Sequence, residues 1–348
     1  MKTSKIFFIS FILFVLCLVI YLFKSYLLTI SVGILMAIST ANLESKVHHM
    51  TGGKRAFSAS IMTGIMLLLF LVPFTYAIVV LASHAASFDM NYIAKVVDYI
   101  KNFDIKLPSV LESFEPKIKS FVASIDIGGV AKELLGYASK IWSKGSDFIV
   151  DLGFVVVFYF FANFYSFDAK KLLKENIPIE NEHLEYISSQ VANTMSVVLY
   201  STIVNALLQG FLFGIIASIF GFNGILMGIL FAFASLIPVV GGALVYVPLS
   251  IYELAIGNKV AAIVILLYSV IVISTLVDNF VKPIIIRFIN SKLVYAPSNI
   301  NEILIFFAMI AGISTFGFWG MILGPAIVTL FVATLGSYQS LKKKFDLE

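Results

Sequence analysis

The chain has 348 residues, of which 60% are hydrophobic and only 13% charged, and its mean hydropathy is +0.99. A soluble protein carries about 25% charged residues, so this chain has too little polar surface to cover a soluble fold. Its 33 Phe and 15 Tyr exclude a disordered chain, and a net charge of +4 is too small to indicate a nucleic-acid partner. We therefore expect an integral membrane protein whose main partner is the lipid bilayer.

The length of the apolar runs favours helices over a transmembrane β-barrel. Barrel strands alternate apolar and polar residues over about ten positions, whereas several runs here approach the roughly 20 residues that cross a bilayer as a helix. The sequence therefore predicts an all-α polytopic membrane protein with about eight transmembrane helices. Its single cysteine, Cys17, lies inside the first apolar run and allows no disulfide within the chain.

The N-terminal segment has the order of a signal peptide but a longer apolar part. Lys2 and Lys5 precede an apolar run over residues 6–23, and no small-x-small cleavage site follows it. We therefore expect an uncleaved first span with the N-terminus in the cytoplasm, as the positive-inside rule favours. A second span is expected over residues 27–41 and a third over residues 58–81, joined by a basic cytoplasmic loop.

Residues 83–146 contain no segment apolar enough to span a membrane. Charges of both signs alternate with apolar residues at helical spacing, which predicts an extramembrane insert of amphipathic helices on the outer side. We interpret it as a solvated cap, or as a packing element between the subunits of a homo-oligomer, in preference to a ligand-binding domain. The predicted division is an N-terminal three-helix membrane segment over residues 1–82, this insert, and a C-terminal transport segment over residues 147–348.

The C-terminal segment contains an internal repeat. Residues 205–228 and 301–324 align without a gap at a shift of 96 positions, with nine identities in 24. The identities cluster on Phe-Gly-Phe-x-Gly-x-x-x-Gly, in which Gly-Phe-x-Gly can form a sharp turn with positive φ. The Gly-x-x-x-Gly part lets two helix backbones approach closely in lipid. The glycines assigned to these roles are Gly221, Gly224, Gly317, Gly320 and Gly324.

Each repeat unit is therefore predicted to be a helical hairpin. The arms of the second unit are only about 15 and about 18 residues long, so they form either a re-entrant hairpin or two full spans. One long kinked helix is the alternative interpretation. Repeats with broken or short apolar helices are typical of the binding sites of secondary transporters.

A break separates the two hairpins. Pro238 removes a backbone donor, and Gly241 and Gly242 release the chain from helix. If residues 243–256 cross the membrane, the basic residues that follow lie in the cytoplasm and the second hairpin enters and leaves from that side, as the positive-inside rule favours. If they do not cross, eight conventional spans result. The sequence leaves both topologies open.

The main polar cluster within an apolar stretch comprises Asp278, Asn279, Lys282 and Pro283. Asp278 and Lys282 are four residues apart, on one helix face, and could pair. Pro283 cannot donate to the carbonyl of Asn279, which leaves an oxygen available to an ion or a ligand. An ionisable group at membrane depth indicates function by default. The alternative is an internally paired helix end near the headgroups, with Lys282 extending to the interface.

A second polar stripe precedes the first Gly-Phe-x-Gly. Ser201, Asn205 and Gln209 recur at every fourth position, which places them on one helix face. We consider Asn205 and Gln209 candidates for binding an ion or substrate. The alternative is that they form hydrogen bonds between helices that hold the bundle together. Weaker candidates, expected near the ends of spans, are Asp151, Glu253 and Glu302.

Three C-terminal motifs carry a resemblance to a known family. They are Asp278-Asn279-x-x-x-Pro283, Gly317-Phe318-x-Gly320-x-x-x-Gly324-Pro325 and Pro238-x-x-Gly241-Gly242. With them, the chain resembles the autoinducer-2 exporter (AI-2E) family, the PerM-like permeases. The order of elements agrees along essentially the whole chain: three N-terminal spans, an amphipathic insert, then the remaining spans.

The resemblance implies a polytopic permease of the bacterial inner membrane. Members are proposed to export the quorum-sensing furanone autoinducer-2, and others to be sodium/proton antiporters. One departure is visible: after Phe158-Tyr159-Phe160-Phe161, where many members carry an acidic residue, this chain has Ala162-Asn163. The positions that match the family's most typical residues are Gln209, Gly210, Pro238, Gly241, Asp278, Asn279, Pro283, Gly320, Gly324 and Pro325.

Three classes of function are compatible with these features. We favour a secondary transporter, driven by a proton or sodium gradient, for a small solute such as autoinducer-2, or a sodium/proton antiporter. A passive channel is the second class, although the chain has no Thr-Val-Gly-Tyr-Gly filter. The third is a membrane enzyme or a non-transport assembly factor. Zinc-protease, serine-hydrolase and Walker A motifs are absent from the sequence, and His48-His49 has no ligand spacing, so we expect no enzyme, metal or cofactor.

Overall fold

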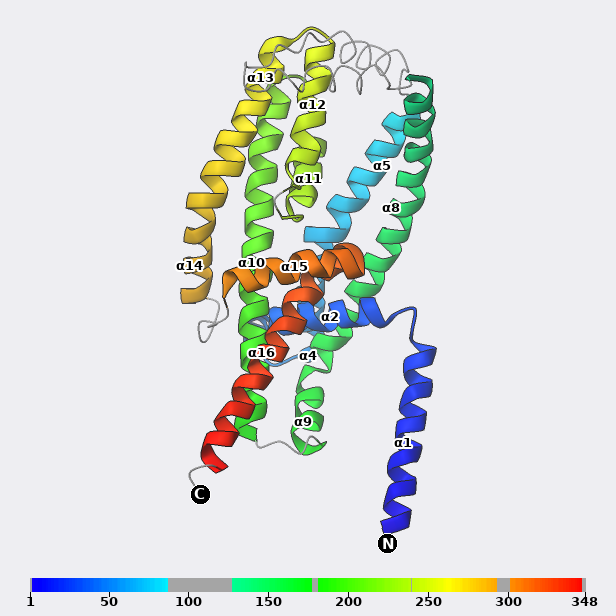
Figure 1. The fold of residues 1–348 in the computed structure, drawn as a ribbon, viewed down its shortest axis with the longest axis vertical. Helices are drawn as coiled ribbons and strands as arrows, with labels where there is room; N and C mark the ends of the chain where they lie inside the picture. The colour runs from blue at the N-terminus through cyan, green and yellow to red at the C-terminus, as the bar shows by residue number, and fades with distance from the viewer. Residues whose placement is uncertain (1, 87–126, 177–180, 239, 293–300, 346–348) are drawn as a thin grey trace, which may run out of the picture. The chain divides into compact units, whose positions relative to one another are not determined.

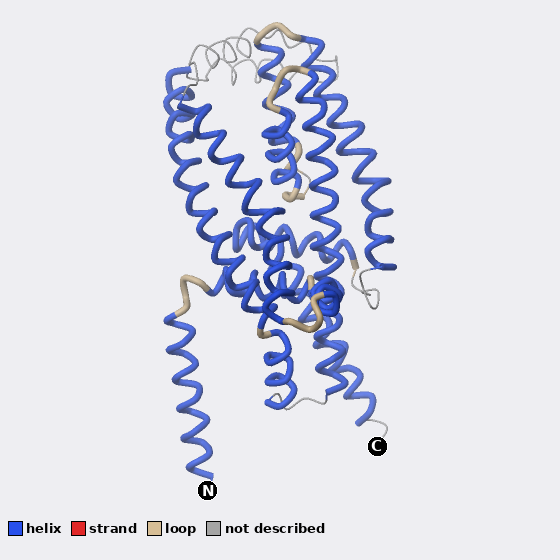
Figure 2. The backbone as a smooth tube through the Cα atoms, turned by 180° about the vertical axis from the view of Figure 1, so that it is seen from behind, coloured by secondary structure: helices blue, strands red, loops and turns tan. Residues whose placement is uncertain are grey.

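The computed structural model describes residues 2–86, 127–176, 181–238, 240–292 and 301–345. Within these ranges the chain forms helices joined by turns and contains no strand (Figure 2). The first helices are α1 (Lys2–Leu22), α2 (Leu27–Ser39), α3 (Ala41–Met50), α4 (Arg55–Met66), the π-helix η1 (Leu67–Leu71), α5 (Val72–Ala86), α8 (Ile127–Phe164) and α9 (Ser166–Asn176) (Figure 1). They are followed by α10 (Asn181–Ile219), α11 (Gly224–Ser235), α12 (Ala243–Ala255), α13 (Lys259–Tyr268), the π-helix η3 (Ser269–Val281), α14 (Lys282–Lys292), α15 (Glu302–Phe316), the 3₁₀ turn η4 (Gly317–Trp319) and α16 (Gly320–Phe345).

Five of the described helical segments are long and apolar enough to cross a membrane, which confirms a helical multi-pass membrane protein. They are Arg55–Leu81, Ser143–Phe164, Asn181–Ile219, Lys259–Ile289 and Ile303–Tyr338. With the bent pair α1–α2 counted as one span, the described residues give up to six by length and composition, and the number of about eight stays a prediction. α1 and α2, predicted as two spans, form a pair bent by 98° that counts as one broken span at most. α2 has 13 residues, about 20 Å of helix, which is shorter than the hydrocarbon core of about 30 Å.

The predicted insert lies mostly outside the described residues. Of residues 83–146, the structure describes only the end of α5 and the first part of α8. α8 is one continuous helix of 38 residues that runs across the predicted boundary at residue 146 and into the fourth span. The amphipathic character and outer location of the insert therefore stay predictions.

The chain divides into two compact units, which are described separately. Unit 1 comprises Met1–Leu68, Asp151–Leu199 and Ile289–Glu348. Unit 2 comprises Leu69–Val150 and Tyr200–Phe288. The two repeat units found in the sequence fall one into each: residues 205–228 in unit 2 and residues 301–324 in unit 1.

In unit 2, the end of α10 and the following α11 form a tight hairpin. Gly221 takes a φ of 86° in the turn, and Asn223 caps α11 by accepting a hydrogen bond from the backbone of Leu226 at 3.0 Å. The two arms meet backbone to backbone: a Cβ at Gly210 would lie 2.5 Å from the carbonyl oxygen of Gly228. Only glycine allows this approach, because any other residue would place a Cβ against the facing backbone. The approach stabilises the hairpin, since in lipid the helices are held together by close van der Waals packing and not by the hydrophobic effect.

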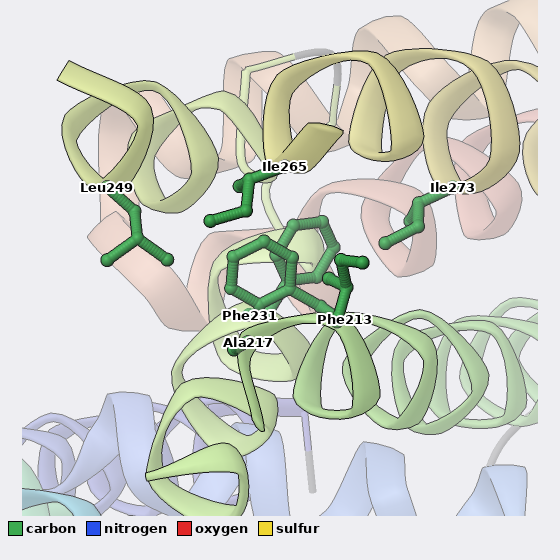
Figure 3. Packing of buried hydrophobic residues seen from close by; sticks show 7 residues of the cluster. Phe213, Ala217, Phe231, Leu249, Ile265 and Ile273 are labelled. Carbon is green, nitrogen blue, oxygen red and sulfur yellow. The ribbon is translucent and has the colours of Figure 1, made fainter. Parts of the chain in front are cut away.

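The core of unit 2 is built on this hairpin. The rings of Phe213 on α10 and Phe231 on α11 stack at 4.4 Å between centroids. Ile265 of α13 and Ile273 of η3 point toward the two rings (Figure 3), and all four side chains are at most 1% exposed. The break predicted between the hairpins is present as a turn between α11 and α12, where a Cβ at Gly242 would meet the ring of Phe231 at 2.9 Å.

In unit 1, α15 and α16 form the second hairpin. By length and composition the stretch Ile303–Tyr338 passes as a single span, but Gly317, with a φ of 64°, ends α15 and the chain folds back through η4. The backbones of Gly312 and Gly320 are in direct contact, as are those of Ala308 and Gly324. This contact excludes the alternative of one long kinked helix. Pro325 lies one turn into α16, where it is among the fully buried side chains.

Replacing Gly320 by alanine tests the role of backbone contact. A Cβ there would overlap the carbonyl of Gly312, so we expect Gly320→Ala to lower the free energy of unfolding by about 1–3 kcal/mol. The matched control is Gly153→Ala in α8, where a Cβ meets nothing within 4 Å and alanine should be neutral or stabilising. Unfolding of the purified protein in bicelles, followed for both variants, measures the difference. Equal stability of the two variants would contradict the close contact.

Candidate functional site

The helix that carries Asp278 has an unusual backbone register. Between α13 and α14 it continues through η3 as 13 residues of π-helix, and the backbone N–H of Lys282 donates to Val277, five residues earlier. π-Helical turns are rare and occur frequently at functional sites. Ser269, Ile273 and Val277 form the buried face of η3, while Asp278 and Asn279 are exposed.

Pro283 interrupts the backbone hydrogen bonds at the end of this π-helix. In the π register the N–H of residue 283 would donate to the carbonyl of Asp278, and proline has no N–H. In the α register, which the sequence predicts, this N–H would donate to the carbonyl of Asn279. Pro283 is the second residue of α14, directly after η3, so at this junction neither carbonyl receives a hydrogen bond from residue 283.

Two carboxamides of α10 hold the Asp278 side chain. Its Oδ1 accepts hydrogen bonds from Nε2 of Gln209 at 2.9 Å and from Nδ2 of Asn205 at 3.2 Å. Gln209 and Asn205 are 4% and 7% exposed. All three residues belong to unit 2. The structure thus brings together two sets of candidate residues that the sequence placed 69 and 73 positions apart.

The alternative of an Asp278–Lys282 pair is not realised among the described residues. Among the described residues, the carboxylate of Asp278 makes no ion pair, because it turns toward α10 and takes its two donors from neutral amides. Lys282 is half-buried at the first position of α14. Asn279, the neighbouring candidate, donates only within its own helix, to the carbonyl of Thr275 at 2.8 Å.

The site contains oxygen atoms without hydrogen-bond donors. In the described part of the chain, Oδ1 of Asn205 is buried and has no partner, and no donor reaches Oδ2 of Asp278. Pro283 has no N–H to donate to the carbonyls of Asp278 or Asn279. Hard cations are bound by carboxylate and carbonyl oxygens, and interrupted helices in transporters use such carbonyls to coordinate sodium ions or protons. The arrangement can therefore accept a small cation or a proton.

The weaker candidates lie elsewhere. Asp151 is exposed on α8, and the side chain of Glu302 is outside the described residues. Glu253, near the end of α12, is 3% exposed and its Oε2 has no partner among the described atoms. Asn258 bonds to the Glu253 side chain and also caps α13 by accepting from Ala261 at 3.3 Å. Glu253 thus connects the end of α12 to the start of α13 through Asn258. In the sequence, this contact could have been found from an acidic residue five positions before an Asn that caps the next helix.

The fold and this site define a multi-pass helical membrane protein with two glycine-packed hairpins and an amide-bound carboxylate on a π-helical segment. The sequence model of the AI-2E family transporter matches residues 8–340, and the chain belongs to this family. A "Putative transport protein" of Helicobacter pylori strain J99 is 34% identical over 255 residues, 73% of each chain. A protein of the same description from Aquifex aeolicus is 28% identical over 79% of this chain and 80% of its own. YdbI of Bacillus subtilis is 25% identical over 91% and 88%.

A double-mutant cycle measures the contact between α10 and η3. Gln209→Met keeps the shape of the side chain but removes the donor, so we expect a loss of about 1.5–3 kcal/mol, as for a hydrogen bond to a charged group. In an Asp278→Leu background the same change should cost much less, giving a coupling of about 0.5–3 kcal/mol. The control pair, Gln209→Met with Asn279→Leu, should be additive within about 0.5 kcal/mol, because Asn279 bonds within its own helix. Additivity in both pairs would argue against the contact.

Proposed function

We propose that this chain is a secondary transporter that moves a small solute or ion across the bacterial inner membrane, coupled to a proton or a sodium ion bound at Asp278. The observation that carries the proposal is the carboxylate of Asp278, held by Gln209 and Asn205 of one candidate span on a π-helical turn of another. The family description and the relatives' names support transport as the class of function. The coupling is our own inference from the site.

The depth of Asp278 supports a coupling role. It lies about three turns from the C-terminal end of the candidate span Lys259–Ile289, about 16 Å along the helix axis, where an ionised carboxylate is costly. It is exposed on the surface of the chain, and no cationic side chain of the described residues neutralises it. A proton, a bound cation or hydration must therefore balance its charge. The first two are what a gradient-driven transporter exchanges.

The contacts suggest how binding at Asp278 would move the protein. A proton on the carboxylate weakens its hydrogen bonds from Gln209 and Asn205 and so loosens the link between η3 and α10. A cation shared by Asp278 and the free Oδ1 of Asn205 tightens the same link. Gln209 directly precedes Gly210, whose backbone touches Gly228 in the hairpin. The charge state of Asp278 would thereby bias the position of the hairpin between two arrangements, which is what alternating access requires.

The chemistry of this site indicates the class of the transported substrate. A site of carboxylate, carboxamide and carbonyl oxygens suits a monovalent cation in exchange for a proton, so sodium/proton antiport is the direct form of the proposal. Export of a small polar solute such as autoinducer-2 is the second candidate, favoured by the name of the family. In either form we place the N-terminus in the cytoplasm, on the basis of Lys2 and Lys5.

Flux in proteoliposomes tests the assignment of Asp278. With imposed proton or sodium gradients, wild-type protein should show saturable flux of a second solute or ion driven by that gradient. A passive channel would conduct that species only down its own gradient. Asp278→Asn should fold and lose at least about 90% of gradient-driven flux, because it cannot change charge. Lys282→Met should keep the sodium and pH dependence, because Lys282 does not bind the carboxylate in the structure.

The two variants and their combination separate coupling from structure. Unchanged pH and sodium dependence in a well-folded Asp278→Asn would show that the coupling assignment is wrong. If each single variant misfolds and the double variant recovers both yield and flux, the two residues form a structural pair, and the coupling site lies elsewhere.

A further inference from the structure

Unit 1 contains a buried acid that the sequence analysis placed in a cytoplasmic loop. Residues 41–50 form α3 instead, and Glu44 on this helix is 7% exposed. A buried carboxylate is costly unless it is paired with a cation or receives several hydrogen bonds. Among the described residues, Glu44 has no ion pair, and its side chain receives a hydrogen bond from one group only, the hydroxyl of Ser58 on α4.

Ser58 connects this acid to a histidine. Its Oγ donates to Oε1 of Glu44 at 3.0 Å, and Nδ1 of His48, one turn along α3, lies 3.3 Å from the same Oγ. Ser58 is fully buried, whereas His48 is partly exposed. The three side chains therefore form an unbroken line of polar atoms from the protein surface to a buried carboxyl group.

The Ser58 hydroxyl can satisfy both charge states of Glu44. With Glu44 ionised, the hydroxyl donates to the carboxylate. With Glu44 protonated, the acid can donate to Ser58 Oγ, and the hydroxyl can turn to the carbonyl of Arg55, which is 3.2 Å away. Neither state leaves the hydroxyl hydrogen unpaired, so both forms are compatible with this buried position.

The surrounding charged and titratable groups are few. From α8, Tyr159 interacts electrostatically with Glu44, and its hydroxyl is bound at 2.9 Å to Thr40, which precedes Glu44 by one helical turn. From α4, the guanidinium of Arg55 is 3.1 Å from Asp168 of α9, so its charge is already paired. His49 and Lys46 of α3 are exposed. Of the groups shown to contact the line, only His48 is both partly exposed and able to carry a proton on a ring nitrogen.

We propose that His48, Ser58 and Glu44 form a proton-exchange site in unit 1, separate from the site at Asp278. The imidazolium of His48 gives its Nδ1 proton to Ser58 Oγ as Ser58 gives its own proton to Oε1 of Glu44. The products are a neutral imidazole and a neutral carboxylic acid, and one proton has moved inward. Solvent then reprotonates His48. The reverse sequence releases the proton.

Infrared difference spectroscopy on full-length protein in nanodiscs detects this proton directly. On acidification, the wild-type spectrum should gain C=O bands of carboxylic acids that include Glu44 and Asp278. In an Asp278→Asn background the Glu44 band should remain, should be missing when Glu44→Gln is added, and should be present with the control Glu182→Gln, which replaces an exposed acid on α10. A spectrum of folded Glu44→Gln identical to that of the wild type would overturn the proposal.

The rate of band formation after a light-triggered proton release tests the relay without changing the acid. Ser58→Ala and His48→Gln should slow protonation of Glu44 by on the order of 100-fold, as expected when a positioned proton-transfer group is removed. Unchanged rates in both variants would exclude the relay. Because both variants retain Glu44, this test stays valid even if Glu44→Gln does not fold. Asp278→Asn should leave the band and its rate intact, so failure here and failure of the coupling site are distinguishable.

Discussion

Lipid hydrocarbon offers no hydrogen-bond partner, so a polar group at membrane depth must be satisfied within the chain. The contact of Asp278 with Gln209 and Asn205 follows from this constraint, because the carboxamides are the donors that α10 presents to the carboxylate. The two helices also share the apolar core that contains Phe213 and Ile273 (Figure 3). The polar contact and the core thus both connect α10 to η3, so a change in one alters the packing of the other.

The same constraint explains why glycine backbones carry the packing of both hairpins. Between lipid-embedded arms there is little hydrophobic gain, and van der Waals contact grows only as the helices approach. Gly320 against Gly312, and Gly228 against Gly210, reach backbone contact in units 1 and 2 respectively. A hairpin packed this way is rigid within itself, so any functional movement is concentrated at its ends, in turns such as the one after Ser235.

Much of the fold could be predicted because the relevant signals are local in sequence. The spacing of Gly221 and Gly317 indicated two turns, and Pro238 indicated the break between them. The exact number of spans stays a prediction, since composition shows that residues 27–41 are apolar but not that a turn at residues 23–26 bends α2 by 98° from α1. The polarity of residues 42–55 suggested a loop. The burial of Glu44 could not be predicted, because its hydrogen-bond partner Ser58 comes close only in the folded chain.

The candidate site could be predicted only in its parts. Asp278, Asn205 and Gln209 each stood out as polar residues in apolar surroundings, but periodicity along one helix does not reveal which residue of another helix it meets. The pairing of Asp278 with Lys282 was a prediction from α-helical spacing within one segment. In the structure the carboxylate bonds to α10 instead, and the carbonyl of Asn279 that Pro283 leaves free stays a prediction.

The π-helix has a consequence for how the chain tolerates change in length. A π-turn contains one residue more than the α-turn that it replaces, so the orientation of Asp278 depends on how many residues precede it in η3. Deleting a single residue between Ser269 and Asp278, with the remaining π-turns kept, would turn the following residues by about 100° about the helix axis. Composition and hydropathy would hardly change, yet the carboxylate would no longer face Gln209. In this segment the residue count itself is under constraint, as strictly as the identity of any side chain.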